Sequence, residues 1–272
     1  MTLHGVASQV YVWMQTYSRQ GQKFEEHLDE VLSDIAAARY DGVETFASLI
    51  ATPEQADWLR RSCDRYRLQL ISLYQGGVYH TRDEGARTVE ETVALARRAS
   101  EVGCPALNIN PNPIGRPKTD EELRIQGEYL NRLGAALKNL GMTLRLHHHD
   151  PEIRDDAREF RANCANTDPA LVRLCLDLHW VLRGGGDPIA LLREYGSQAD
   201  SLHIRNSTGG VWSEALGDGD IDYRQVRATL EAVGFQGWLI VELAYEPQTV
   251  VTRPLAENIR LSREYVRTVF GQ

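Results

Sequence analysis

Short apolar segments recur along the chain, and most of them are followed by a longer segment with the periodicity of an amphipathic helix. In the predicted helix over 24–39, Leu28, Leu32 and Ile35 fall on one face, which is typical of a single buried stripe. Eight such alternations of strand and helix fill the chain. The predicted strands cover residues 10–14, 42–46, 70–73, 106–110, 143–147, 173–178, 201–204 and 238–241.

Alternation of strands and helices over a whole chain is typical of two architectures, a closed eight-stranded barrel and an open doubly wound sheet. An open nucleotide-binding sheet usually has a glycine-rich turn after its first strand, but the sequence there, at 15–17, is Gln-Thr-Tyr. The 272 residues also suffice for the roughly 250 that a barrel needs. The pattern therefore predicts an α/β fold, a single (β/α)8 TIM barrel over residues 1–272.

Polar side chains lie where predicted strands five to eight end, which in a barrel is the face that carries the chemistry. Alternate residues of a strand face the same side, and the residues between these polar ones are mostly apolar, so the polar set is expected to point into the barrel. Histidines and carboxylates are costly there unless they are paired, hydrogen-bonded or bound to a metal. The residues that share a face in this way are His147 with His149, Asp177 with His179, and His203 with Arg205, and Glu242 ends strand eight.

Imidazole and carboxylate ligands together suit zinc, manganese, cobalt or nickel rather than calcium, and the absence of thiolates argues against a structural zinc site. We therefore predict a catalytic site for one divalent metal ion. Its ligands are predicted to be His147, Asp177, His203 and Glu242. Because His149 has the same parity as His147, either histidine can be the fourth ligand, and the other is then free to move a proton.

Further polar and aromatic residues at strand ends are candidates for contact with substrate. Each has a structural alternative: Glu44 can anchor a loop, Asn108 can serve a turn, and Trp180 can be core packing instead of the apolar wall for a sugar ring. His148 has the opposite parity and is expected to be structural, as is Asn110. The candidate substrate-binding residues are Glu44, Asn108, His179, Trp180 and Arg205.

These residues lie in motifs that resemble the xylose isomerase-like TIM barrel superfamily, the sugar phosphate isomerases and epimerases that also include inosose dehydratase, hydroxypyruvate isomerase and endonuclease IV. The resemblance covers nearly the whole chain. The motifs are Tyr40-Asp41-Gly42-Val43-Glu44, Leu146-His147-His148-His149-Asp150-Pro151-Glu152, Asp177-Leu178-His179-Trp180, Leu216-Gly217-Asp218-Gly219-Asp220-Ile221-Asp222 and Trp238-Leu239-Ile240-Val241-Glu242.

The resemblance implies a carbohydrate substrate, a manganese, cobalt, magnesium or zinc ion held by the residues named above, and a homodimer or homotetramer. Two positions depart from the family pattern. Ketose epimerases of the superfamily use a glutamate where this chain has His147, and many relatives have a lysine where this chain has Arg205. Since arginine hardly ever loses its proton, Arg205 is expected to orient substrate or stabilise negative charge.

The predicted chemistry starts with removal of a proton from the carbon between a carbonyl and a hydroxyl, which gives an enediolate. His149 is the candidate proton carrier, with Glu152 as its orienter or a second base and His179 as a rival. The first hypothesis is a metal-dependent isomerase or epimerase of a sugar or keto-sugar. The alternatives are a lyase, a dehydratase or β-eliminase acting on a keto-inositol or 3-keto-glycoside, and a non-catalytic sugar-binding barrel or subunit of a larger enzyme.

Composition narrows the partners and the location. The net charge of −8 disfavours nucleic acid, including the DNA that an endonuclease would bind. The four cysteines form no C-x-x-C pair, and no segment has 18 uninterrupted apolar residues, so we expect a cytoplasmic protein without membrane contact. With only the segment 207–210 as a weak phosphate cradle, neutral substrates are favoured.

Overall fold

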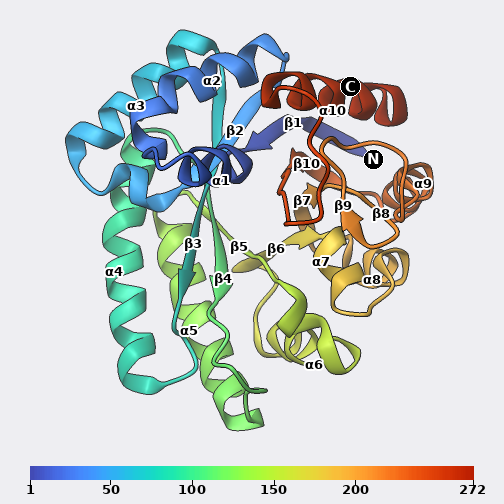
Figure 1. The fold of residues 1–272 in the computed structure, drawn as a ribbon. Coiled ribbons are helices and arrows are strands. Elements are labelled where there is room, and N and C mark those ends of the chain that lie inside the picture. The colour runs from blue at the N-terminus through green and yellow to red at the C-terminus, as the bar shows by residue number, and fades with distance from the viewer.

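The computed structural model describes all residues from 1 to 272 and shows eight parallel strands closed into a barrel with helices around it (Figure 1). Around the barrel the strands follow the order β1-β10-β7-β6-β5-β4-β3-β2, so the first and last strands of the chain pair with each other. The barrel strands are β1 (Thr2–Gln9), β2 (Gly42–Phe46), β3 (Gln69–Gly77), β4 (Ala106–Pro111), β5 (Thr143–Leu146), β6 (Val172–Asp177), β7 (Ala199–Ile204) and β10 (Gln236–Val241).

The helices form the outer layer and pack their apolar faces on the barrel (Figure 1). They are α1 (Tyr11–Arg19), α2 (Leu28–Ala37), α3 (Pro53–Tyr66), α4 (Arg82–Glu101), α5 (Asp120–Asn139), α6 (Asp150–Asn166), α7 (Leu178–Arg183), α8 (Pro188–Tyr195), α9 (Tyr223–Ala232) and α10 (Leu255–Phe270), with 3-10 turns η1 (Phe24–His27) and η2 (Ala47–Ile50). This arrangement confirms the predicted (β/α)8 barrel. None of the helices combines the length and apolarity needed to cross a bilayer.

The first predicted strand is wrong. The segment 10–14 leads into α1, and the true first strand is β1, Thr2–Gln9. The sequence Val-Tyr-Val-Trp-Met has the β-branched and aromatic composition of a strand, but such propensity is easily overridden by tertiary context. Here Val12 and Trp13 are buried on one side of a short helix, whose first N–H, that of Tyr11, is bound by the Gln9 side chain.

Strand register brings the ends of β6, β7 and β10 to one level of the barrel. Asp177 pairs with His203 across β6 and β7, and His203 pairs with Ile240 across β7 and β10. Glu242, two residues past Ile240, therefore presents its side chain from the same face as that strand residue. The outward residues between them, such as Leu176 and Ile204, are fully buried in the main hydrophobic core.

A small antiparallel hairpin stands beside the barrel opening. Its strands, β8 (Ser207–Thr208) and β9 (Val211–Trp212), are joined by two glycines, Gly209 and Gly210. Both have φ in the left-handed region, +58° and +82°, as the tight two-residue turns of hairpins require. The turn thereby folds Trp212 back onto the end of β7.

Close packing at the opposite end of the barrel gives a test of the fold. A side chain at Gly237 on β10 would overlap the backbone of Asp200. We expect Gly237→Ala to lower the free energy of unfolding by about 1–3 kcal/mol, measured by urea denaturation. Gly217→Ala is the matched control, because no atom of the surrounding structure lies within 4 Å of the place that an added methyl group would occupy. Equal stability of the two variants would contradict the close approach of β10 and β7.

Candidate metal centre and active site

His147, Asp177, His203 and Glu242 lie together at the C-terminal ends of four adjacent strands. Each offers one ligand atom, and these atoms all lie within 4.8 Å of one another. His203 Nδ1 is 3.2 Å from Glu242 Oε2 and 4.0 Å from Asp177 Oδ2, and His147 Nε2 is 3.8 Å from Asp177 Oδ2. The structure thus gathers the four residues that the sequence proposed as ligands.

Asp177 has both carboxylate oxygens engaged. Oδ1 accepts hydrogen bonds from the backbone N–H groups of His179 and Trp180, at 2.9 and 2.8 Å, and so caps α7. Oδ2 accepts from Arg205 Nη2 at 2.9 Å and faces the other three residues. Although burial opposes its ionisation, the Arg205 guanidinium and the His147 ring hold the pKa of Asp177 well below its usual range.

His147 is oriented by Asn110, which the sequence indicated as structural. Its Nδ1 lies 3.1 Å from Asn110 Oδ1, and an amide oxygen can only accept, so Nδ1 carries the proton. Nε2 is then the free nitrogen, and it has no hydrogen-bond partner although it is buried. Burial lowers the pKa of His147, which keeps the ring in the neutral form that metals bind.

His203 is held from behind by Glu44. The Glu44 Oε1 atom lies 2.8 Å from His203 Nε2, and Oε2 accepts hydrogen bonds from Ser72 Oγ, at 2.5 Å, and from Asn108 Nδ2. Such a carboxylate behind a histidine ligand fixes the ring and makes it more basic. Glu44 and Asn108 are fully buried and do not line the cavity. The structure therefore places these two residues, expected at the substrate, behind a candidate metal ligand instead.

The donor set fits one divalent ion. His147 Nε2 and His203 Nδ1 are buried without a hydrogen-bond partner, which is costly unless a ligand satisfies them. Glu242 Oε2 likewise makes no hydrogen bond, although it has ion-pair contacts at 3.2 Å with His203 and Arg205. Donors about 2.0–2.2 Å from one ion lie at most about 4.4 Å apart. The observed span of 4.8 Å therefore has to contract by a few tenths of an ångström on binding. Two imidazoles and two carboxylates suit zinc, manganese or cobalt.

A cavity of about 450 Å³ opens above this centre. Glu242, Arg205, His149 and Trp180 line it, as the sequence placed them at the substrate or the metal. Sequence reasoning missed the other walls. Tyr74 lies on β3, whose polar end was not considered, Trp212 lies on the hairpin, and Gln9 and Tyr11 were hidden by the misplaced first strand. The remaining lining residues are Phe46, Pro113, Asp150 and Pro151.

His149 and Glu152 lie at the start of α6 but have different access to the cavity. The His149 ring lies 5.0 Å from the rings of both His147 and Trp180, and it makes no side-chain hydrogen bond. Burial lowers the pKa of His149 to about 3, so the ring is neutral and one of its nitrogens carries a free lone pair. Glu152 is buried behind it, and its Oε2 accepts from the His149 backbone N–H at 2.7 Å.

His148 and His179 both face away from the cavity. His148 Nε2 accepts from the Asp177 backbone N–H at 3.2 Å, and its ring packs on Phe160. His179 is fully buried between Trp212 and Ser207, so the structure does not bring this predicted substrate residue to the cavity. Burial lowers its pKa to about 4.

The weak phosphate cradle expected at 207–210 is already filled. Asp220 accepts hydrogen bonds from the backbone N–H groups of Gly209 and Gly210, at 3.0 and 2.8 Å, and from Ser207 Oγ at 2.7 Å. A carboxylate of the chain thus holds the donors that a phosphate would need. This supports the expectation of a neutral substrate.

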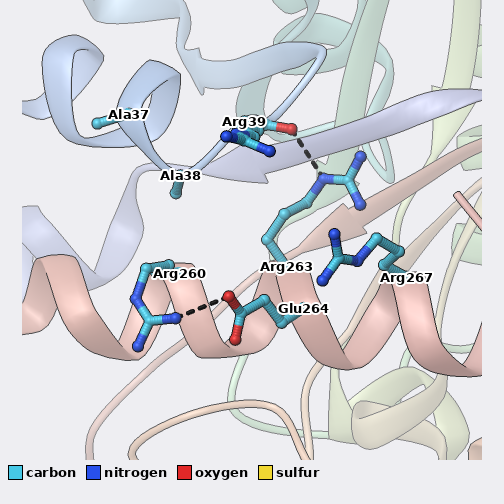
Figure 2. A pocket seen from close by; sticks show the side chains of 7 residues that line it. All are labelled: Ala37, Ala38, Arg39, Arg260, Arg263, Glu264 and Arg267. Carbon is cyan, nitrogen blue, oxygen red and sulfur yellow. Dashed lines mark hydrogen bonds and ion pairs between the residues drawn. The ribbon is translucent and has the colours of Figure 1, made fainter.

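A second hollow, of about 540 Å³, lies on the outer layer between α2 and α10 (Figure 2). It is lined by four arginines, two alanines and a glutamate and shares no residue with the cavity at the barrel end. Arg263 Nε donates to the Arg39 carbonyl at 2.9 Å, and Arg260 pairs with Glu264 at 2.7 Å. The first contact joins the segment after α2 to α10, and the second lies within α10, so we assign this hollow to helix packing and not to the reaction.

Comparison with known proteins identifies the family to which this barrel belongs. Residues 32–269 match the xylose isomerase-like TIM barrel family, and the chain belongs to that family. Inosose dehydratase of Bacillus licheniformis is 30% identical over 88% of this chain and 87% of its own length. Inosose dehydratase of Geobacillus kaustophilus is 26% identical over 88% and 86%, and the rhizopine catabolism protein MocC of Rhizobium meliloti is 25% identical over 81% and 75%.

Solved structures show the same fold at lower identity. D-psicose 3-epimerase of Clostridium cellulolyticum superposes with a TM-score of 0.79 at 14% identity, with 99% of each chain covered. The E. coli 3-keto-D-glucoside 4-epimerase YcjR gives a TM-score of 0.72 at 16% identity, covering 98% of this chain and 99% of that one. At these identities the likeness establishes the barrel and its closure.

The buried Glu152 carboxyl makes stability depend on pH. Burial raises its pKa from 4.5 to about 7, so between these values the folded protein keeps a proton that the unfolded chain releases. Stability therefore falls as the pH rises through this window, by about 3 kcal/mol in total. We expect Glu152→Gln to remove this part of the dependence of the free energy of unfolding on pH. The measurement is urea denaturation from pH 5 to 8 in buffer that contains a metal chelator. An unchanged slope would show that Glu152 ionises normally.

Proposed function

We propose that this protein is a divalent-metal-dependent lyase that dehydrates a neutral cyclic keto-polyol of the inosose class. The observation that carries the proposal is the candidate metal centre, in which His147 stands among the four candidate ligands and the His149 ring lines the cavity above them. The names of the curated relatives support the same reaction class. The filled cradle at Gly209 and Gly210 favours substrates without phosphate.

The metal would be held by His147, Asp177, His203 and Glu242, and when bound it would polarise the substrate carbonyl and so acidify the neighbouring C–H bond. Neutral His149 accepts that proton, because its ring is unprotonated and faces the cavity. The electron pair of the broken C–H bond forms a carbon–carbon double bond, and the C–O bond at the next carbon breaks. The hydroxide leaves as water with the proton that His149 accepted, which restores the neutral ring, so no oxidant or reductant is needed.

Arg205 supports this chemistry through charge. Its guanidinium is buried, lines the cavity, and lies 2.9 Å from Asp177 Oδ2 and 3.2 Å from Glu242 Oε2. A permanently charged donor at this place stabilises the negative charge that develops on the substrate oxygen during proton removal. It does so without having to lose or gain a proton itself.

An isomerase or epimerase is the second candidate, and the sequence alone placed it first. It is favoured by the presence of two proton acceptors, His149 and Glu242, on the cavity wall. The preference for a lyase comes from His147, which stands where the two-glutamate epimerases have their second carboxylate. Incubation with inosose and with D-tagatose separates the two: an ultraviolet-absorbing enone indicates the lyase, and an isomeric ketose indicates the epimerase.

Asp177→Ala tests the metal centre. Removal of one of four ligands is expected to abolish tight binding of Mn²⁺, Co²⁺ or Zn²⁺ to chelator-treated protein, measured by titration calorimetry, together with activity on inosose. Asp187→Ala is the matched control, because Asp187 caps α8 through two backbone N–H groups as Asp177 caps α7. A metal-free, fully active Asp177 variant would refute the assignment.

His149→Gln tests the proton carrier. Glutamine fills similar space but cannot accept the proton, so metal affinity is expected to persist. Exchange of the substrate C–H hydrogen with deuterated solvent is expected to slow by about 10² or more, followed by NMR on inosose. Exchange at the wild-type rate would exclude His149 as the base.

A further inference from the structure

Trp212, on the hairpin beside the barrel, is fixed at every polar atom. Its backbone N–H donates to Glu246 Oε1 at 2.7 Å, and its carbonyl accepts from Thr249 Oγ1 at 2.9 Å. Its indole Nε1–H donates to His179 Nδ1 at 3.0 Å. A hairpin with only two residues in each strand is marginally stable by itself. These three hydrogen bonds therefore hold the Trp212 side chain in place.

The indole bond determines the tautomer of His179. An indole N–H can only donate, so Nδ1 of His179 accepts and the ring proton is on Nε2. Nε2 lies 2.8 Å from Ser207 Oγ, and that hydroxyl in turn donates to Asp220 Oδ2 at 2.7 Å. Each donor in this chain of four residues therefore has an acceptor, and its direction runs from Trp212 to the Gly-Asp-Gly-Asp segment at 217–220.

The other end of the chain lies against the candidate catalytic cation. The Arg205 guanidinium carbon lies 4.6 Å from the centre of the Trp212 ring and 5.0 Å from that of Trp180. The two indoles are nearly perpendicular, at 82°, with centres 5.4 Å apart. They form a corner around the guanidinium, which restricts it laterally while its nitrogens reach Asp177 and Glu242.

We infer that His179 and Trp212 are positioning residues for Arg205, and that the hydrogen-bonded chain Asp220–Ser207–His179–Trp212 sets where this cation stands over the reacting atoms. This inference rests on the proposed function only where its test measures activity. It explains why a fully buried histidine that does not line the cavity lies two residues after a candidate metal ligand. It also gives the β8–β9 hairpin a role, which is to hold Trp212 against Arg205.

The test compares two replacements of His179. Glutamine supplies an oxygen that can accept from Trp212 and an amide that can donate to Ser207, whereas leucine supplies neither. The first readout is the circular dichroism signal of the coupled Trp180–Trp212 pair, which Trp212→Phe abolishes and thereby identifies. His179→Leu is expected to lose most of this signal, and His179→Gln is expected to keep it. His27→Leu and Trp58→Phe, both on the outside of the barrel, are the matched controls.

The second readout is the kinetics on inosose. His179→Leu is expected to lower kcat about 10–100-fold with little change in KM or in Mn²⁺ affinity, and His179→Gln is expected to restore kcat. An unchanged signal and kcat in the leucine variant, or equal loss in both variants, would overturn the inference. Should the leucine variant fail to fold, Ser207→Ala removes the next link and is judged by the same readouts. Absence of turnover in the wild type would refute the proposed function, while the dichroism comparison would still decide the positioning chain.

Discussion

The burial of the Asp177 carboxylate is the constraint around which the site is organised. A charged carboxylate with no exposure to water is stable only when every oxygen has a partner. Oδ1 satisfies this by capping α7, which ties the direction of that helix to the end of β6. Oδ2 faces His147, His203 and Arg205. Its negative charge is therefore balanced by the Arg205 guanidinium or by a metal ion.

Two sets of polar and aromatic residues hold the groups around Asp177 in place. Asn110, Glu44 and His148 hold, respectively, the His147 ring, the His203 ring and the Asp177 backbone, and none of the three lines the cavity. On the other side, Trp180 and Trp212 hold Arg205. Side chains that are held in this way need not move during a reaction. A preorganised site stabilises the transition state because this reorganisation is avoided. His149, by contrast, lines the cavity and packs against the rings of His147 and Trp180.

The relatives of this chain carry the names of several reaction types, dehydratases and epimerases among them. A histidine at 147 would coordinate a metal as a neutral ligand, whereas a glutamate there would add a negative charge and a second base. The centre of this protein accordingly carries two carboxylates, those of Asp177 and Glu242, with one permanent cation between them. The proposed elimination needs only one base to start, and this charge balance supports that proposal.

The sequence by itself determined the barrel, seven of its eight strands and the four clustered candidate ligands, because periodicity and strand parity are local properties that survive in the folded state. It misplaced the first strand, since the β-rich composition of 10–14 was overridden by packing in α1. Only the tertiary structure decided that Glu44 and Asn108 stand behind His203, and that His179 holds Trp212. The first of these roles depends on which residues of distant strands face each other inside the barrel, and the second depends on how the hairpin packs against α7. Neither contact lies within one stretch of sequence, so no local pattern predicts it.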